Sequence, residues 1–175
     1  MESRLVEDNL RKHSLATEAI MRALAQRLGH DPEVWGMAGL LHDIDFPETR
    51  DAPERHALAA AEMLREKGVS DEIIEAIKAH NAEALGIPRE GPLAVALTAA
   101  ETITGMVVAT TLVYPDKKIA GVKPKSITKR MKQKEFARAI NRDHIRLCEE
   151  IGVPLDEFAA LSLEAMGTIS GKLGL

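Results

Sequence analysis

The sequence predicts an all-α fold, a compact single-domain bundle of about seven or eight helices. Three observations predict it. Aromatic residues make up only 3% of the chain while Ala and Leu are common, a mixture that suits packed helices better than strands. Apolar residues recur at steps of three and four along most segments. The connections are short, and we find no convincing strand, internal repeat or low-complexity segment.

The first two helices have clear boundaries in the sequence. A periodic apolar stripe predicts one helix over residues 5–28, and Gly29 suits its C-cap. Asp31 and Pro32 then provide an N-cap and a proline at the first helical position. The second helix is expected to run to about His42.

A loop is expected over residues 44–53, where Pro and charged residues interrupt the pattern. Pro53 can open a third helix that ends at Gly68. Ser70 caps a fourth helix, and Asp71 favours its positive N-terminal end.

The second half of the chain begins with a long fifth helix, which starts at Gly91-Pro92 and ends at Tyr114-Pro115. The next segment is basic and is predicted as a loop plus a short helix after Ser126. Two further helices, at about 134–150 and 156–171, are expected to finish the chain.

The net charge of -4 conceals an uneven distribution of charge. Residues 1–116 carry 11 Lys and Arg against 20 Asp and Glu, whereas residues 117–146 carry 11 against 2. The last 29 residues carry 1 against 5. An acidic whole argues against general nucleic-acid binding, and the basic segment favours a small anionic ligand.

Composition also sets expectations for the compartment. The single cysteine, Cys148, rules out an internal disulfide framework and fits a reducing cytoplasm. No apolar run reaches ~18 residues, so no membrane span is expected. Residues 1–8 are charged and lack the apolar region of a secretory signal. A homodimer is a further expectation, although no helical stripe identifies its interface.

The first five predicted helices each place a metal-ligating type of residue on the stripe that should be buried. The set is His13, His42, His56, His80 and Glu101, with Asp43 beside the second histidine. A lone histidine on an apolar stripe is more often a satisfied core residue than a ligand. Several together favour a metal, because buried imidazoles and carboxylates need partners and one ion serves several of them.

The ligand types indicate two transition-metal ions. Imidazole and carboxylate without thiolate suit Fe, Mn, Co, Ni or Zn. One ion would be held by His13, His42, Asp43 and Glu101, and a second by His56, His80 and Asp43. Asp43 has two oxygens and could bridge them. Two ions about 3.5–4 Å apart support hydrolysis of a phosphate ester by an activated water.

These residues resemble the metal motif of the HD-domain superfamily of metal-dependent phosphohydrolases. The matching positions are His13, the pair His42-Asp43, His56 in Glu54-Arg55-His56-Ala57, His80 in Ala76-Ile77-Lys78-Ala79-His80-Asn81, and a distal carboxylate. The similarity extends to HDIG-type hydrolases in the stretches 99–105, 125–132 and 136–138, and so covers most of the chain. The resemblance implies a single hydrolase domain over residues 1–175, with a metal-binding core at about 5–112 and the basic segment and C-terminal helices at 117–175.

Two positions depart from the superfamily pattern. The distal carboxylate is usually Asp, and here it is Glu101. Many relatives follow the His-Asp pair with Ile-Gly-Lys, whereas Ile44-Asp45-Phe46 follows here. A lysine that could help bind substrate is therefore missing. Asp45 either orients a ligand histidine or faces solvent.

The basic segment supplies the candidate substrate-binding residues Lys125, Lys129, Arg130 and Arg142. Close to the metal ions they would bind a phosphate-bearing substrate. The alternative is a solvated charged face, or a contact between subunits.

The resulting prediction is a cytoplasmic metal-dependent phosphohydrolase, in which Asp43 bridges two ions and activates water. It would act on a phosphate ester or anhydride of a small metabolite or nucleotide, as a phosphomonoesterase, phosphodiesterase or nucleotidase. Its partner would be a small phosphorylated substrate, without general nucleic-acid binding and without a membrane. Two alternatives remain open: a di-iron oxygenase of the same superfamily, and a non-catalytic sensing module stabilised by metal.

Overall fold

The computed structural model describes residues 2–175, with side chains from Glu7 onward, and the all-α prediction is confirmed because no strand occurs among them. The helices of eight residues or more are α1 (Glu2–Leu28), α2 (Pro32–Leu41), α4 (Leu58–Glu66), α5 (Asp71–His80), α7 (Gly91–Leu112), α8 (Pro124–Met131) and α10 (Leu155–Thr168). The short elements are α3 (Phe46–Thr49), α6 (Ala82–Leu85), α9 (Arg142–Arg146), α11 (Ser170–Leu173) and the 3-10 turns η1 (Ile119–Gly121) and η2 (Leu147–Glu149).

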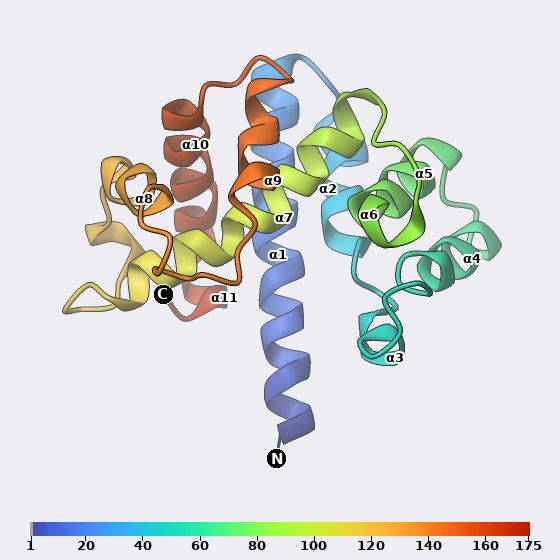
Figure 1. Cartoon of the computed structure of the whole chain (residues 1–175), viewed down its shortest axis with the longest axis horizontal. Helices are drawn as coiled ribbons and strands as arrows, with labels where there is room; N and C mark the ends of the chain where they lie inside the picture. The colour runs from blue at the N-terminus through green and yellow to red at the C-terminus, as the bar shows by residue number, and fades with distance from the viewer. Residues whose placement is uncertain (1) are drawn as a thin grey trace.

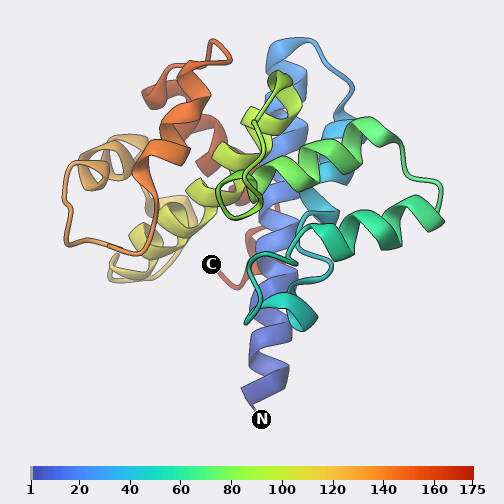
Figure 2. The same cartoon turned by 45° about the vertical axis from the view of Figure 1, so that its right-hand side comes forward.

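Helices α1 and α7 form the frame of the molecule. Figures 1 and 2 show α1 as a long upright helix, with α7 crossing it. In Figure 1, helices α2 to α6 lie on one side of α1, and α8 and α10 lie on the other. The N-terminal turns of α1 extend beyond the rest of the chain in both views.

Helix α7 is the core helix. It contacts α1, α2, α5, α8, α9 and α10, and its residues Leu97, Ile103 and Met106 are fully buried. It is also long and apolar enough to cross a membrane, but 72% of its most apolar window is buried inside the protein. The packing around α7 therefore accounts for its apolar character.

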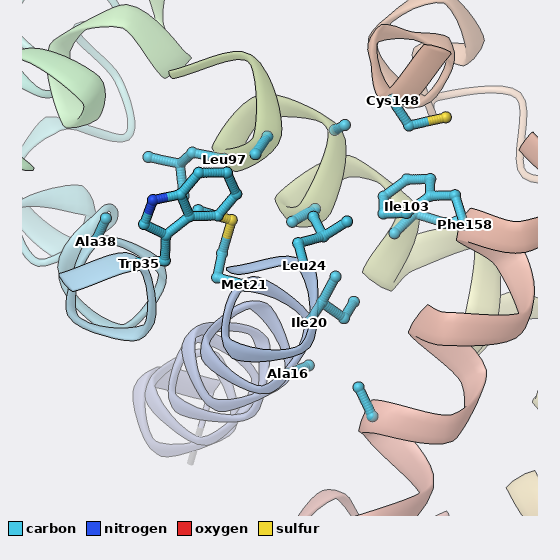
Figure 3. Packing of buried hydrophobic residues seen from close by; sticks show 14 of the residues in the cluster. Ala16, Ile20, Met21, Leu24, Trp35, Ala38, Leu97, Ile103, Cys148 and Phe158 are labelled. Carbon is cyan, nitrogen blue, oxygen red and sulfur yellow. The ribbon is translucent and has the colours of Figure 1, made fainter. Parts of the chain in front are cut away.

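A buried stripe on α1 packs against α2 and α7. Figure 3 shows Met21 and Leu24 of α1 facing Trp35 of α2 and Leu97 of α7. Fully burying one such side chain contributes about 1.5–3 kcal/mol to folding. On the far side of α7, Cys148 is also fully buried, and burial raises the pKa of its thiol to about 12. The cysteine is therefore a small core residue.

Helices α1 and α2 approach each other so closely that one position must be glycine. A Cβ added at Gly39 would lie 2.9 Å from the backbone nitrogen of Glu18 and 3.0 Å from its Cα. Backbone atoms cannot move aside as a flexible side chain can. This contact positions the end of α2, and with it His42, against α1.

The third helix begins later than predicted. Helix α4 starts at Leu58 instead of Pro53, because Ala57 has a left-handed backbone (φ 69) that interrupts the helix. The predicted loop over 44–53 contains the single turn α3. The residues before α4 therefore form a separate, irregular segment that carries His56.

The predicted helix over 134–150 is wrong in its first half. Residues 132–141 are irregular, and Ala137 has a left-handed backbone (φ 46). Helix α9 begins only at Arg142, because the Asn141 side chain accepts hydrogen bonds from the backbone N–H groups of Asp143 and His144. An asparagine N-cap of this kind starts a new helix.

We expect Gly39→Ala to destabilise the protein by about 1–3 kcal/mol, because the added methyl group meets the backbone of α1. Gly167→Ala, at a position within α10 where a Cβ meets nothing within 4 Å, is the control. It should stabilise by about 0.5–1 kcal/mol through helix propensity. Urea unfolding measures both, and equal effects of the two substitutions would contradict the close approach of α1 and α2.

Candidate metal centre

Two groups of ligand-type side chains meet at Asp43. The first contains His13, His42 and Asp43, and the second contains Asp43, His56 and His80; in each group the donor atoms lie within 4.8 Å of one another. His13 comes from α1, His42 and Asp43 follow α2, His56 precedes α4, and His80 ends α5. Five of the six predicted ligands are thus brought together from four parts of the chain.

The Asp43 carboxylate lies between two pairs of histidines. Its Oδ2 is 3.8 Å from Nε2 of His13 and 3.5 Å from Nε2 of His42. Its Oδ1 is 3.2 Å from Nε2 of His56 and 3.6 Å from Nε2 of His80. Each oxygen therefore faces one pair, which is the arrangement that a bridging carboxylate requires.

The spacing within each pair also fits metal ligation. The Nε2 atoms of His13 and His42 are 3.1 Å apart, and those of His56 and His80 are 3.0 Å apart. Two nitrogens that bind one ion at ~2.0–2.1 Å and at right angles are about 3 Å apart. Two nitrogen lone pairs at this separation repel unless a proton or a cation lies between them. The donor set therefore fits a metal ion at each pair.

The other ring nitrogen of each histidine meets an oxygen acceptor. Nδ1 of His42 donates to the carbonyl of Gly39 at 2.8 Å, and Nδ1 of His80 donates to the carbonyl of Ile77. Nδ1 of His56 lies 2.9 Å from Oδ1 of Asp45. These contacts assign the Nδ1–H tautomer and leave the Nε2 atoms for a metal.

His13 is oriented by a threonine of α7. The Thr104 hydroxyl donates its proton to the backbone carbonyl of Glu101 at 2.6 Å. Its oxygen is therefore left to accept from Nδ1 of His13, which is 3.0 Å away. Thr104 therefore orients His13, and the candidate site residues identified from the sequence did not include it.

Asp45 holds His56 in place. It is 0% exposed, and its Oδ2 accepts from the backbone N–H groups of Ala57 (2.8 Å) and Ala60 (3.1 Å). Its Oδ1 faces His56. Of the two interpretations left open for Asp45, the solvent-facing one is wrong.

The segment before α4 is tied down at further points. The Asn81 side chain donates to the carbonyls of Pro53 (2.8 Å) and His56 (3.0 Å), and thereby joins this segment to the end of α5. Thr49 donates to the carbonyl of Asp45 at 2.9 Å. The Asn81 contacts were not predicted, because side-chain bonds between distant segments leave no periodic signal. The strained backbone of Ala57 is held by these surroundings.

Burial and neighbouring charges tune the site. Burial lowers the pKa of His42 to about 3, so this ring is neutral. Burial alone would raise the pKa of Asp43, but His42, His56 and His80 outweigh it and hold that pKa well below its usual value. At His56 burial lowers the pKa, and hydrogen bonds to Asp43 and Asp45 reverse this and raise it to about 9. The ionised Asp43 thus faces the His56 ring, whose Nε2 proton a cation would replace.

Glu101 lies near the first group but outside it. It shares with His13 and Thr104 the lining of a hollow of about 330 Å³, which Asn141 and His144 also line. Its carboxylate accepts a hydrogen bond from Thr102 and belongs to neither ligand group. Glu101 as a ligand stays a prediction. His144 lines the same hollow, and its Nε2 lies 3.0 Å from Oε1 of Glu83.

A second hollow of about 540 Å³ adjoins the first, since both are lined by His13, Thr104 and Gly105. Its other walls come from α1, the second half of α7 and the C-terminal residues, and they are largely apolar. Substrate therefore has room on the His13 side of the centre.

The basic candidates do not lie beside the metal ligands. Lys125 and Lys129 line a different hollow, which shares no residue with the two at His13. Arg130 lies over the ring of Phe136, 5.1 Å from its centroid, and donates to the carbonyl of Ser126. The structure does not bring these residues together with the metal ligands, because α8 lies on the opposite side of α1 from α4 and α5 (Figure 1). A contact between them and substrate stays a prediction.

Arg142 contacts the backbone of the neighbouring segment, and its predicted substrate contact stays a prediction. Its guanidinium donates to the backbone carbonyls of Gln133, Phe136, Ala137 and Ile140. Its donors are thus used to hold the irregular segment 132–141, which has no regular backbone pairing of its own.

Comparison with known proteins identifies the fold. A family model described as the HD domain matches residues 10–107. The chain is 34% identical over 97 residues to a protein named Ribonuclease Y from Oleidesulfovibrio alaskensis, and 41% identical over 98 residues to one from Chlorobium luteolum. Each match covers 55% of this chain and 18% of the relative, so the matched part is about a fifth of the curated relatives' length. No solved structure matches the chain.

The names of these relatives correct one prediction. The sequence analysis expected a small phosphorylated partner and no general nucleic-acid binding, mainly from the net negative charge. The relatives are named as ribonucleases, and this contradicts that expectation. Net charge was a poor guide to the binding partner, because it adds the charge of a basic segment to that of an acidic remainder.

We expect Thr104→Val to weaken Mn²⁺ binding at the group of His13, His42 and Asp43 by about 10- to 100-fold, because valine cannot accept the Nδ1 proton of His13. Isothermal titration calorimetry measures the affinity. Thr110→Val is the matched control on the same helix, since the buried Thr110 hydroxyl has no partner among the described residues. An unchanged affinity in the Thr104 variant would count against His13 as a ligand.

We expect Asp45→Asn to reduce occupancy of the second group by about 10- to 100-fold, because an amide cannot accept from both His56 and the two backbone N–H groups. Elemental analysis after dialysis should show loss of about one ion per chain, with the first group retained. Asp51→Asn, on the exposed part of the same segment, should leave the metal content unchanged. Full metal content in the Asp45 variant would contradict its positioning role.

Proposed function

Because the chain belongs to the HD-domain family, a superfamily of metal-dependent phosphohydrolases, we propose that it hydrolyses phosphodiester bonds of RNA with two metal ions. The observation that carries the proposal is the position of Asp43, each of whose oxygens faces one pair of histidines. The names of the relatives support RNA as the substrate. The ribonuclease relatives are much longer than the segment that matches this chain. The substrate and the activity are therefore proposed for this chain from the residues that it contains.

Two ions would be held by the two ligand groups. His13 and His42 would bind one ion, His56 and His80 the other, and Asp43 both. Imidazole and carboxylate donors without thiolate suit Fe, Mn, Co, Ni or Zn. Such ions activate a water molecule and offset the charge of phosphate oxygens.

The chain itself contributes orientation and access. Thr104, Asp45 and the carbonyls of Gly39 and Ile77 fix the four rings, so that little rearrangement is needed when ions bind. The two adjoining hollows at His13 give an extended substrate a path past the centre. Burial of Asp45 and His42 keeps water away from the back of the site.

The competing functions use the same ligands and differ in their reactions. A di-iron oxygenase would consume oxygen, and a metal-stabilised sensing module would catalyse nothing. An intact set of five converging ligands argues for chemistry, because a purely structural ion needs only one of the two groups.

The test is hydrolysis by the purified chain loaded with Mn²⁺. We expect cleavage of bis(p-nitrophenyl) phosphate and of a short RNA, and loss of both activities with a chelator. Asp43→Asn should lower kcat by at least about 100-fold, because the bridging charge is lost. Circular dichroism checks that this variant folds.

Each alternative has its own result. Hydrolysis of phosphomonoesters without any diester or RNA cleavage would overturn the substrate assignment. Oxygen uptake by the iron-loaded protein without hydrolysis would favour the oxygenase. A variant at Asp43 that keeps full activity would remove the bridging carboxylate from the mechanism.

A further inference from the structure

The positive charge of the chain is gathered in one segment that the metal centre does not use. Residues 117–146 carry 11 Lys and Arg against 2 Asp and Glu, whereas all other residues carry 12 against 25. The segment includes α8, which lies on the opposite side of α1 from α4 and α5 in both views (Figures 1 and 2). It also follows the residues that match the HD-domain model, which end at 107.

Four of these cations surround one hollow of about 570 Å³. They are Lys125, Lys129, Lys132 and Arg146. None of the three lysines is paired with a carboxylate among the described residues, so their charges remain available. The acidic groups in the hollow are Glu149, which lies 3.4 Å from Arg146, and Asp156 in the first turn of α10.

The positions of Lys125 and Lys129 on α8 destabilise the protein when no ligand is bound. Ile127 and Met131 are buried and anchor one face of α8, which leaves Lys125 and Lys129 on the hollow. They are four residues apart, so their like charges repel each other. Lys125 also lies in the first turn of α8, where the helix dipole disfavours a cation and where no acidic residue compensates. A negatively charged ligand in the hollow would relieve both effects.

We propose that this hollow, with Lys125, Lys129 and Lys132, binds the phosphate backbone of RNA away from the metal centre. The proposal rests on the proposed function, because it assigns to the same substrate a second place of contact. The hollow shares no lining residue with the two hollows at His13, so it holds a part of the RNA remote from the bond being cleaved. Lysines without base-reading partners would bind any sequence.

The experiment compares the triple variant Lys125→Ala, Lys129→Ala, Lys132→Ala with the unaltered chain. Fluorescence anisotropy with a labelled RNA of about 20 nucleotides measures binding, and the Mn²⁺-loaded protein is assayed on the dinucleotide UpU. We expect the Kd for RNA to rise about 10-fold or more, and the slope of log K against log salt to fall by about 2. Turnover of UpU, which is too short to reach the hollow, should not change.

A control variant removes the same charge elsewhere. It replaces three exposed residues by Ala: Arg65 on α4, Lys67 directly after α4, and Lys172 on α11. We expect this control variant to bind RNA as the unaltered chain does. The proposal is overturned if the lysine variant binds RNA normally, if the control loses as much affinity, or if UpU turnover falls equally. Preference of these lysines for phosphatidylglycerol vesicles over RNA would also overturn it.

The binding measurement needs no catalysis and therefore separates the two proposals. If neither RNA nor UpU is cleaved but the lysine variant loses RNA affinity, the proposed function fails and the hollow is supported. If both are cleaved and the variant binds RNA normally, the proposed function stands and the hollow is rejected.

Discussion

The structure depends on one largely buried carboxylate, whose side chain is 13% exposed. Asp43 lies where α2 ends, and burying its charge is costly unless partners surround it. Those partners come from α1, from the segment before α4 and from the end of α5, so the same residue that organises the metal centre also decides which parts of the chain meet. Gly39 allows the required approach of α1 and α2. Fold and site are therefore linked in this protein, because the packed helices α1, α2 and α5 also carry ligands or end beside them.

The segment from Asp45 to Ala57 shows how this constraint overrides local preference. A helix from Pro53 would have continued through His56 with good periodicity. Instead Asp45 captures the backbone N–H groups of Ala57 and Ala60, and Ala57 adopts a left-handed backbone that alanine ordinarily avoids. The result is a ring at position 56 aimed at Asp43. The hydrogen bonds of Asp45 offset the cost of the left-handed backbone at Ala57, because the buried carboxylate needs donors and His56 needs an acceptor.

A feature could be predicted from the sequence when the residues that determine it lie close together along the chain. Helices α1, α2, α5 and α7 were predicted within a few residues, because periodicity and caps are local signals. The convergence of His13, His42, Asp43, His56 and His80 was also predictable, since polar residues on buried stripes need a shared partner. The start of α4 and the irregular segment 132–141 were not, because they depend on the side chains of Asp45 and Arg142 meeting distant backbone groups. Spacing likewise placed Glu101 on the correct face of α7, but it carries no information on the direction of a flexible side chain.

The distribution of charge explains why net charge misled. Carboxylates are needed where cations bind, and lysines are needed where phosphates bind, so a metal-dependent enzyme acting on a polyanion requires both signs. Here the acidic part carries Asp43 and Asp45 and the basic part carries α8, which lies on the opposite side of α1 from α4 and α5. Their sum, a net charge of -4, reports neither requirement. The separation of the α8 lysines from Asp43 also has a physical reason. Lysines beside Asp43 would compete with metal ions for its carboxylate.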